Sequence, residues 1–301
     1  MSDGGRNDRV EGAELGRAAM APAWREPMLV LGASGMLGRA VLEELGRRRL
    51  RVQGFTRAEL DLGRPEALRA IPPGTGTVIN CAAWTNVDAA ESQEAEATRI
   101  NGHAVGELAA RCRELGAVLV HYSTDYVFPG QATAPYPIDH ERAPINAYGR
   151  SKALGEQLLE QSRASYLLLR TSWVYAPWGK NFVRTILGLA RQRPTLRVVS
   201  DQLGRPSSAE QIARVTAELL ATAALGTFHV SDAGQCSWFE FASAAVELAG
   251  LSCRVEPCTS AEFPSPARRP NYSVLDLDTT LARVGPLVGW RESLASVVPR
   301  I

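Results

Sequence analysis

Leu29-Val30-Leu31-Gly32-Ala33-Ser34-Gly35-Met36-Leu37-Gly38 is the stretch that decides the fold. It joins an apolar run to three spaced glycines, and a helical pattern over residues 39–49 follows. Strand, glycine loop and helix in this order form the context of a dinucleotide fingerprint, although glycine turns also arise there for packing alone. Gly32 permits the tight turn, Gly35 lets backbone N–H groups approach a pyrophosphate, and Gly38 allows the helix to pack closely.

Apolar runs alternate with helical patterns outward from this stretch. Strands are predicted at 51–56, 77–80, 117–120 and 166–170, and helices from Pro65, at 94–115 and at 146–162. Such alternation is typical of a parallel, doubly wound sheet. Later segments are less regular: helices at 182–191, 209–221 and 236–248, and strands at 196–199 and 226–230.

We therefore predict an α/β protein: a Rossmann-like doubly wound parallel sheet with a smaller C-terminal α/β substrate-binding lobe. The sheet domain is expected to span residues 28–172. The lobe is expected to take most of 173–301, with some segments returning to the sheet. Residues 1–27 are rich in Gly, Arg, Glu and Ala and predict a disordered tail. Met1, Met20 and Met28 all stay open as the start.

A second motif pair predicts the chemistry. His121-Tyr122-Ser123-Thr124-Asp125-Tyr126-Val127-Phe128 follows a buried run, so its hydroxyls should lie at the carboxyl end of a strand, where open α/β sheets bind ligands. Tyr148 and Lys152 share one face of the following helix. An ammonium beside a phenol favours the phenolate and lowers the pKa of the tyrosine, which makes it a usable proton donor. Tyr-x-x-x-Lys alone also occurs by chance.

The residue that reads the adenosine ribose should follow the strand at 51–56, and the acid typical of NAD sites is missing there. Arg57 stands in its place, and a guanidinium suits a 2′-phosphate. NADPH is therefore favoured over NADH. Glu59 keeps NADH possible, and an arginine at this position can also be an ordinary surface residue.

Composition limits the class of protein. The 33 basic and 32 acidic residues provide no field for nucleic acid or an anionic membrane, so a small-molecule ligand is expected. The five cysteines lack metal-ligand spacing, which favours the reducing cytoplasm, and a Cys253–Cys258 pair receives little weight. No apolar run is long enough for a membrane span, and no signal peptide is recognisable.

Several sequence blocks, in order, resemble the dTDP-4-dehydrorhamnose reductases, a branch of the extended short-chain dehydrogenases. They cover Met28 to about Leu294 and comprise 32–38, 78–88 with Glu91, 123–128, 148–152, 170–175, and Arg269-Pro270 before Ser273. The resemblance implies reduction of the 4-keto group of dTDP-4-dehydro-L-rhamnose to dTDP-L-rhamnose, for cell-surface polysaccharide.

The resemblance also implies residue roles. Tyr148 is expected to donate the proton, Lys152 to support it and to hold the nicotinamide ribose, and Thr124 to hydrogen-bond the carbonyl oxygen. Trp173 is expected to pack against the sugar, although core packing would explain it equally well. The expected cofactor contacts are Gly32, Ser34, Gly35, Met36, Leu37, Gly38, Arg57, Asp61, Leu62, Cys81, Ala82, Ala83, Tyr148 and Lys152. The expected substrate contacts are Thr124, Asp125, Trp173, Asn181 and Arg269; of these, Asn181 and Arg269 are, like Arg205, weaker candidates for contacts with the nucleotide.

Some relatives are expected to dimerise through a metal held by glutamates, one of them on the first helix, where this chain has Ala40. We therefore expect no metal, and a monomer or homodimer. Two alternatives stay open: reduction of another dTDP-4-keto-6-deoxyhexose, and a non-catalytic regulatory subunit that keeps the nucleotide site. Intact Thr124, Tyr148, Lys152 and Trp173 favour an enzyme.

Overall fold

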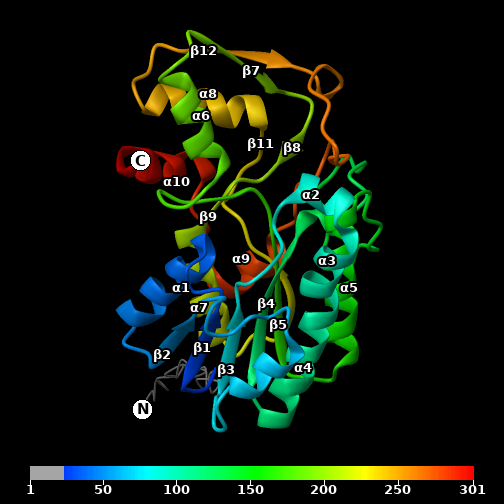
Figure 1. Cartoon of the computed structure of the whole chain (residues 1–301). Helices are drawn as coiled ribbons and strands as arrows, with labels where there is room; N and C mark the ends of the chain where they lie inside the picture. Colours follow the sequence, from blue (N-terminus) through cyan, green and yellow to red (C-terminus); the bar gives the residue numbers. More distant parts are fainter. Residues whose placement is uncertain (1–23) are drawn as a thin grey trace, which may run out of the picture.

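The computed structural model describes residues 24–301 and is built around a six-stranded parallel sheet (Figure 1). Its strands are β1 (Met28–Leu31), β2 (Val52–Phe55), β3 (Thr77–Asn80), β4 (Val118–Thr124), β5 (Tyr166–Thr171) and β10 (Gly226–His229). They lie in the order β10-β5-β4-β3-β1-β2. The order reverses direction between β1 and β3, which is the switch point where such sheets bind ligands.

Two helical layers cover the sheet because its strands are apolar on both faces. Met28 and Val30 face α1 (Met36–Arg47) and α7 (Ala209–Ala221), whereas Leu29 and Leu31 face the layer of α4 (Ala104–Leu115) and α5 (Ala147–Gln161). Figure 1 shows the two layers on opposite sides of the sheet. The short helices are α2 (Val87–Ser92), α3 (Glu94–Thr98), α9 (Asp278–Val284) and the 3₁₀ turns Pro65–Ala70, Asp125–Val127, Ser260–Glu262 and Val298–Arg300. The predicted doubly wound α/β fold is confirmed.

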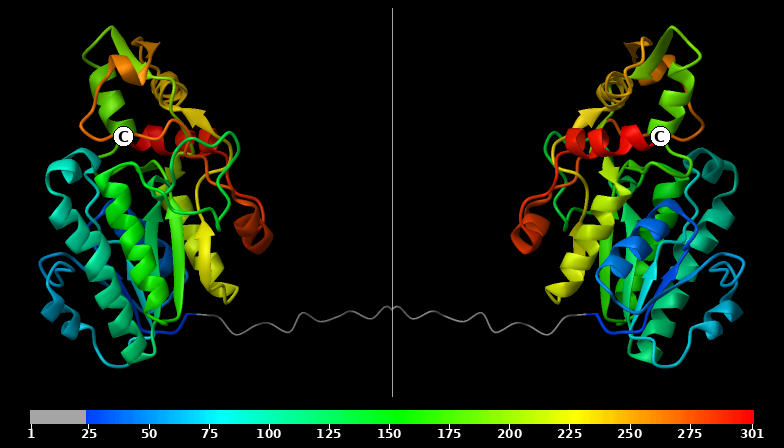
Figure 2. Two further views of the ribbon diagram at one scale, coloured as in Figure 1. Left: turned by 90° about the vertical axis from the view of Figure 1, so that its right-hand side faces the viewer. Right: turned by 90° about the vertical axis from the view of Figure 1, so that its left-hand side faces the viewer.

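The smaller lobe lies at one end of the sheet, as Figures 1 and 2 show. It contains α6 (Phe182–Ala190), α8 (Trp238–Leu248) and α10 (Trp290–Val297). Three strand pairs complete it: β6 (Val174–Tyr175) with β9 (Ser207–Ser208), β7 (Thr195–Val199) with β12 (Arg254–Cys258), and β8 (Leu203–Gly204) with β11 (Cys236–Ser237). Of the C-terminal region, α7 and β10 belong to the larger sheet layer.

Several elements differ from the prediction, most of them by one or two residues at an end. The helix after the glycine loop begins at Met36 rather than Arg39, and β4 continues to Thr124. The expected single helix over 94–115 is interrupted by a π-helical turn at Arg99–His103, where the Asn101 side chain bonds the backbone of Trp84 instead of facing solvent. Of the predicted tail at 1–27, residues 1–23 lie outside the part of the chain that the structure describes. Arg25 exchanges hydrogen bonds with the Thr77 hydroxyl, so the ordered chain begins before Met28.

All five cysteines are free thiols, including Cys253 and Cys258. Within residues 24–301, every helix is too short or too polar to cross a lipid bilayer.

Candidate active site

Thr124, Asp125 and Tyr148 meet at the carboxyl end of β4. Thr124 is the last residue of the strand, and its hydroxyl donates to Asp125 Oδ1 over 2.9 Å. Tyr148 lies in the first turn of α5, whose start is fixed because Asn146 Oδ1 accepts the Gly149 N–H at 2.7 Å. The Tyr148 phenol is close enough to the Thr124 hydroxyl for that group to influence its pKa.

Lys152 lies one turn further along α5 and is buried. Its ammonium donates to Tyr122 O at 2.6 Å, and no hydrogen bond links it to Tyr148 within the described chain. The expected lowering of the tyrosine pKa is absent: burial raises the pKa of Tyr148, Asp125 raises it further, and Thr124 only partly opposes them. Burial is the dominant effect, so the phenol holds its proton until a reacting oxygen takes it.

Asp125 is a buried carboxyl next to this group. Burial raises its pKa to about 7, and the nearby hydroxyls of Ser273 and Thr124 oppose the rise. Its second oxygen, Oδ2, has no hydrogen-bond partner within residues 24–301. A buried polar atom without a partner is costly, so this oxygen is available to a ligand.

The glycine loop is shaped for a close backbone approach. Gly32 has a φ of +73°, and a Cβ there would lie 2.8 Å from Ala82 N. A Cβ on Gly38 would collide with Gly32 O, so this glycine packs against the loop itself. The first N–H groups of α1 are not capped by a side chain, because Gly35 is the N-cap. This geometry suits the pyrophosphate of a dinucleotide.

The predicted cofactor contacts around the loop differ in exposure. Ser34 is exposed and Leu37 is half-buried, whereas the Leu62 side chain belongs to the core, leaving only its backbone for a ligand. The backbone carbonyl of Met36 accepts a hydrogen bond from Trp178 Nε1 at 3.2 Å. Arg57 is largely exposed after β2, and its Nε lies 3.4 Å from Asp61 Oδ2.

Cys81, Ala82 and Ala83 follow β3 and are half-buried beside the glycine loop. Asn80 Oδ1 accepts the Ala82 N–H at 3.1 Å, which fixes the turn. Burial raises the pKa of the Cys81 thiol, so a packing role suits it better than a nucleophilic one.

Trp173 is placed by a strained backbone and by aromatic packing. Its φ of +46° is unusual for a residue other than glycine. Its ring stacks on Trp238, with centroids 3.5 Å apart and planes 10° apart. A Cβ on Gly204 would lie 2.6 Å from Trp173 Cε2, so the glycine makes room for the indole. The ring is half-buried, and Trp238 covers one of its faces.

Three further predicted polar residues are engaged by the protein. Asn181 caps α6 and donates to Ala176 O at 2.8 Å. Arg269 pairs with Asp88 at 2.9 Å, and the carbonyl of its neighbour Arg268 accepts from Asn146, so this segment lies close to α5. Arg205 donates to the carbonyls of Leu275 and Gly234.

Sequence reasoning assigned no role to His121, Ser273 or Asn146. Asn146 could have been found, since an asparagine directly before a helical pattern signals an N-cap. Ser273, from a distant part of the chain, lies close enough to Asp125 to lower its pKa, and His121 lies behind Lys152. No local pattern reports such contacts.

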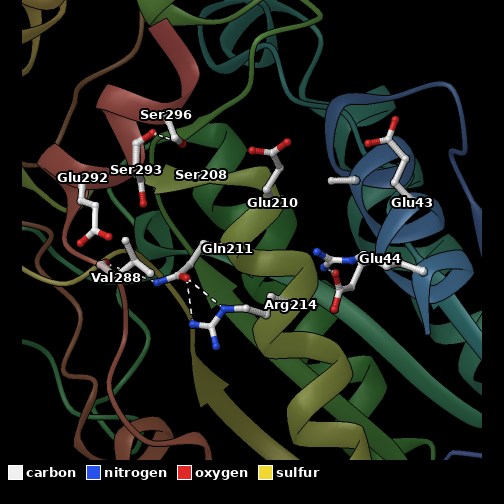
Figure 3. A pocket seen from close by; sticks show the side chains of 12 residues that line it. Glu43, Glu44, Ser208, Glu210, Gln211, Arg214, Val288, Glu292, Ser293 and Ser296 are labelled. Carbon is white, nitrogen blue, oxygen red and sulfur yellow. Dashed lines mark hydrogen bonds and ion pairs between the residues drawn. The ribbon is translucent and has the colours of Figure 1, made fainter. Parts of the chain in front are cut away.

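A cavity of about 530 Å³ lies elsewhere, between α1, α7 and α10 (Figure 3). Ala40, Glu43, Glu210 and Glu292 line it, and Figure 3 shows Gln211 bonded to Arg214 there. Thr124, Tyr148 and Lys152 do not line it, so this cavity is separate from the predicted chemistry. The described chain contains no group of three or more His, Cys, Asp or Glu residues placed to hold a metal ion.

Comparisons with known proteins agree with the fold and with the family resemblance. The family described as "RmlD substrate binding domain" matches residues 26–301. A dTDP-4-dehydrorhamnose reductase of Burkholderia thailandensis is 42% identical over 90% of this chain and 97% of its own length. A dTDP-4-keto-6-deoxy-D-glucose reductase of Streptomyces niveus is 38% identical over 90% of this chain and 96% of its own.

A solved structure of the dTDP-4-dehydrorhamnose reductase of Bacillus anthracis, in complex with NADP, is also similar. Its TM-score is 0.88 at 35% identity, covering 92% of this chain and all of the other.

Proposed function

The chain belongs to the dTDP-4-dehydrorhamnose reductase family, and we propose that it reduces the 4-keto group of dTDP-4-dehydro-L-rhamnose to dTDP-L-rhamnose. Such a reaction serves nucleotide-sugar and cell-surface polysaccharide synthesis. The observation that carries the proposal is the placement of Thr124, Asp125 and Tyr148 together at the carboxyl end of β4. One strand, β3, separates β4 from β1, the strand that leads into the glycine loop. Five free thiols suit an enzyme that works in the reducing cytoplasm.

The chain's residues fit a nicotinamide dinucleotide. The loop from Gly32 to Gly38 and the uncapped start of α1 would hold the pyrophosphate, and Arg57 would hold a 2′-phosphate. The similar structure from Bacillus anthracis is a complex with NADP, which supports NADPH as the cofactor. Bound NADPH supplies a hydride to the keto carbon.

Side chains of the protein orient the keto oxygen and supply its proton. Tyr148, whose raised pKa keeps the phenol protonated, gives its proton to the oxygen as negative charge develops there. Thr124 lies beside the phenol and orients the same oxygen by a hydrogen bond. The free oxygen of Asp125 accepts from a sugar hydroxyl. Lys152 restores the proton of Tyr148.

The substrate would extend from these groups toward the smaller lobe. Trp173 supplies an aromatic edge for the deoxysugar, backed by Trp238. Arg269 lies near α5 through its neighbour Arg268, and can exchange Asp88 for a phosphate of the substrate. Asn181 acts indirectly, by holding the start of α6.

A substrate panel tests the proposal. Purified protein should oxidise NADPH with dTDP-4-dehydro-L-rhamnose at a kcat/KM at least about tenfold above that with dTDP-4-keto-6-deoxy-D-glucose, a ratio that about 1.4 kcal/mol of differential binding supplies. The reverse ratio would favour the activity named for the Streptomyces niveus relative. No turnover with either sugar, together with tight NADPH binding, would favour a regulatory subunit.

A further inference from the structure

His121 lies behind Lys152 in the dry interior between β3, β4 and α5. Its two ring nitrogens face two different groups: Nδ1 lies 3.1 Å from Asn80 Nδ2, and Nε2 lies 3.4 Å from Lys152 Nζ. Asn80, His121 and Lys152 are each at most 2% exposed. These polar atoms therefore lie away from bulk water, and their hydrogen bonds are made to one another and to the neighbouring backbone.

The orientation of Asn80 decides where the proton of His121 lies. Asn80 Oδ1 accepts the Ala82 backbone N–H at 3.1 Å, and a backbone N–H can only donate. The amide nitrogen of Asn80 consequently points to His121 and donates to Nδ1. A neutral imidazole that accepts at Nδ1 carries its proton on Nε2. Burial, and then the charge of Lys152, hold the pKa of His121 well below its usual range, so the ring is neutral.

The Nε2–H of His121 therefore points at the Lys152 nitrogen. An ammonium has no lone pair to accept this hydrogen, whereas a neutral amine has one. Lys152 already donates to Tyr122 O at 2.6 Å, a bond that both charge states can make. We propose that His121 is a positioning residue: its Nε2–H favours the neutral amine of Lys152 over the ammonium. Lys152 therefore releases a proton to Tyr148 more readily during each turnover.

The proton balance is complete without a further reactant. Tyr148 loses its proton to the reduced oxygen, and the Lys152 ammonium then loses one proton to the tyrosinate. The remaining amine accepts the Nε2–H of His121 and regains its proton from solvent before the next turnover. This step rests on the proposed reductase function, whereas the tautomer of His121 does not.

The other charged groups around Lys152 do not replace this effect. Burial lowers the pKa of Lys152 to about 8, and Glu156 on the same helix opposes the decrease. Glu156, however, is itself bound by Arg170 on β5 and by Arg142. Burial also raises the pKa of the Tyr122 phenol on β4 and of the Tyr148 phenol on α5, so both are uncharged.

Nitrogen-15 NMR of the full chain with labelled histidine tests the tautomer directly. We expect His121 to show a protonated Nε2 and an unprotonated Nδ1, and to stay neutral as pH falls through the ordinary titration range of histidine, because burial lowers its pKa. A proton on Nδ1, or a charged ring at pH 7, would overturn the proposal whether or not the protein turns over a sugar. His121→Gln assigns the resonance among the four histidines.

The pH profile of kcat tests the consequence. In the wild type, kcat should fall as pH rises through the pKa of Lys152, near 8. In His121→Gln an amide oxygen can accept from the ammonium, so the fall should move upward by about one pH unit. Asn80→Asp should move it in the same direction, because the carboxylate keeps the Ala82 bond and draws the histidine proton to Nδ1.

The matched control is His229→Gln, which removes another buried histidine on β10. Its profile should keep the wild-type midpoint. Folded His121→Gln and Asn80→Asp proteins with unshifted profiles would overturn the proposal. If the wild type reduces no 4-keto sugar, the proposed function is wrong, and the NMR result alone decides the tautomer.

Discussion

The two sides of the candidate site are built differently. Thr124 and Tyr148 lie on a long buried strand and a 15-residue helix, where regular hydrogen bonding fixes the backbone that carries their side chains. Trp173 lies between the end of β5 and the two-residue strand β6, has a left-handed backbone, stacks on Trp238 and fits in the space at Gly204. The contrast indicates that the residues assigned to the reaction lie on regular, rigid elements of the fold. Substrate recognition comes from an irregular part that can vary more easily.

The largest effect is expected at Tyr148, on the regular helix of the site. Tyr148→Phe removes the only proton donor assigned to the reacting oxygen and should lower kcat by roughly a hundredfold or more. NADPH affinity should change little, because the glycine loop and Arg57 are untouched. Stopped-flow turnover and a fluorescence titration of NADPH measure the two quantities. Near-normal turnover in the folded variant would remove Tyr148 from the mechanism.

A smaller effect is expected on the irregular side. Trp173→Ala should raise the KM for the dTDP-sugar by about tenfold, the size of a lost aromatic contact, while kcat falls less. Its melting temperature should fall less than that of Trp290→Ala, a core aromatic of the same lobe whose loss costs about 3–5 kcal/mol. Unchanged sugar affinity with a large stability loss would make Trp173 a packing residue only.

Cofactor choice should depend on an exposed residue. Arg57→Ala should raise the KM for NADPH by up to about fivefold, the range of exposed charge pairs, and leave the KM for NADH unchanged. Arg64→Ala is the control, because it removes a similar exposed arginine near Asp61. Equal changes for both cofactors would show that Arg57 does not read the 2′-phosphate.

The smallest effect compares two buried carboxyls: Asp125 in the site and Asp232, which accepts a hydrogen bond from the Tyr175 hydroxyl. Burial raises the pKa of both Asp125 and Asp232 to about 7. Since the unfolded pKa is about 3.9, each group makes the folded state lose stability as pH rises from about 4 through 7. Asp232→Asn should weaken the fall of the melting temperature over this window without moving the kcat profile.

Asp125→Asn should weaken the same fall and also lower turnover, since Thr124 donates to this carboxyl. The comparison would fail if Asp232→Asn lowered turnover as strongly as Asp125→Asn does.

The regular strands and the glycine loop could be predicted from the sequence because the patterns that indicate them are local. The glycine loop and the strand at 77–80 follow from patterns within a few residues, and the structure matches that strand to the residue. The pKa of Tyr148 could not be predicted, because it depends on burial by distant segments. Likewise, Trp238 and Gly204 reach Trp173 only through the folded lobe.

The most direct test of the central claim follows the hydrogen that NADPH transfers. Wild-type protein is mixed with dTDP-4-dehydro-L-rhamnose and NADPH deuterated at the transferred position, and the sugar product is examined by proton NMR. The account predicts dTDP-L-rhamnose with one deuterium at C4, formed in equal amount to the NADPH consumed. A product without deuterium at C4, or full retention of both NADPH and the keto sugar, would contradict it.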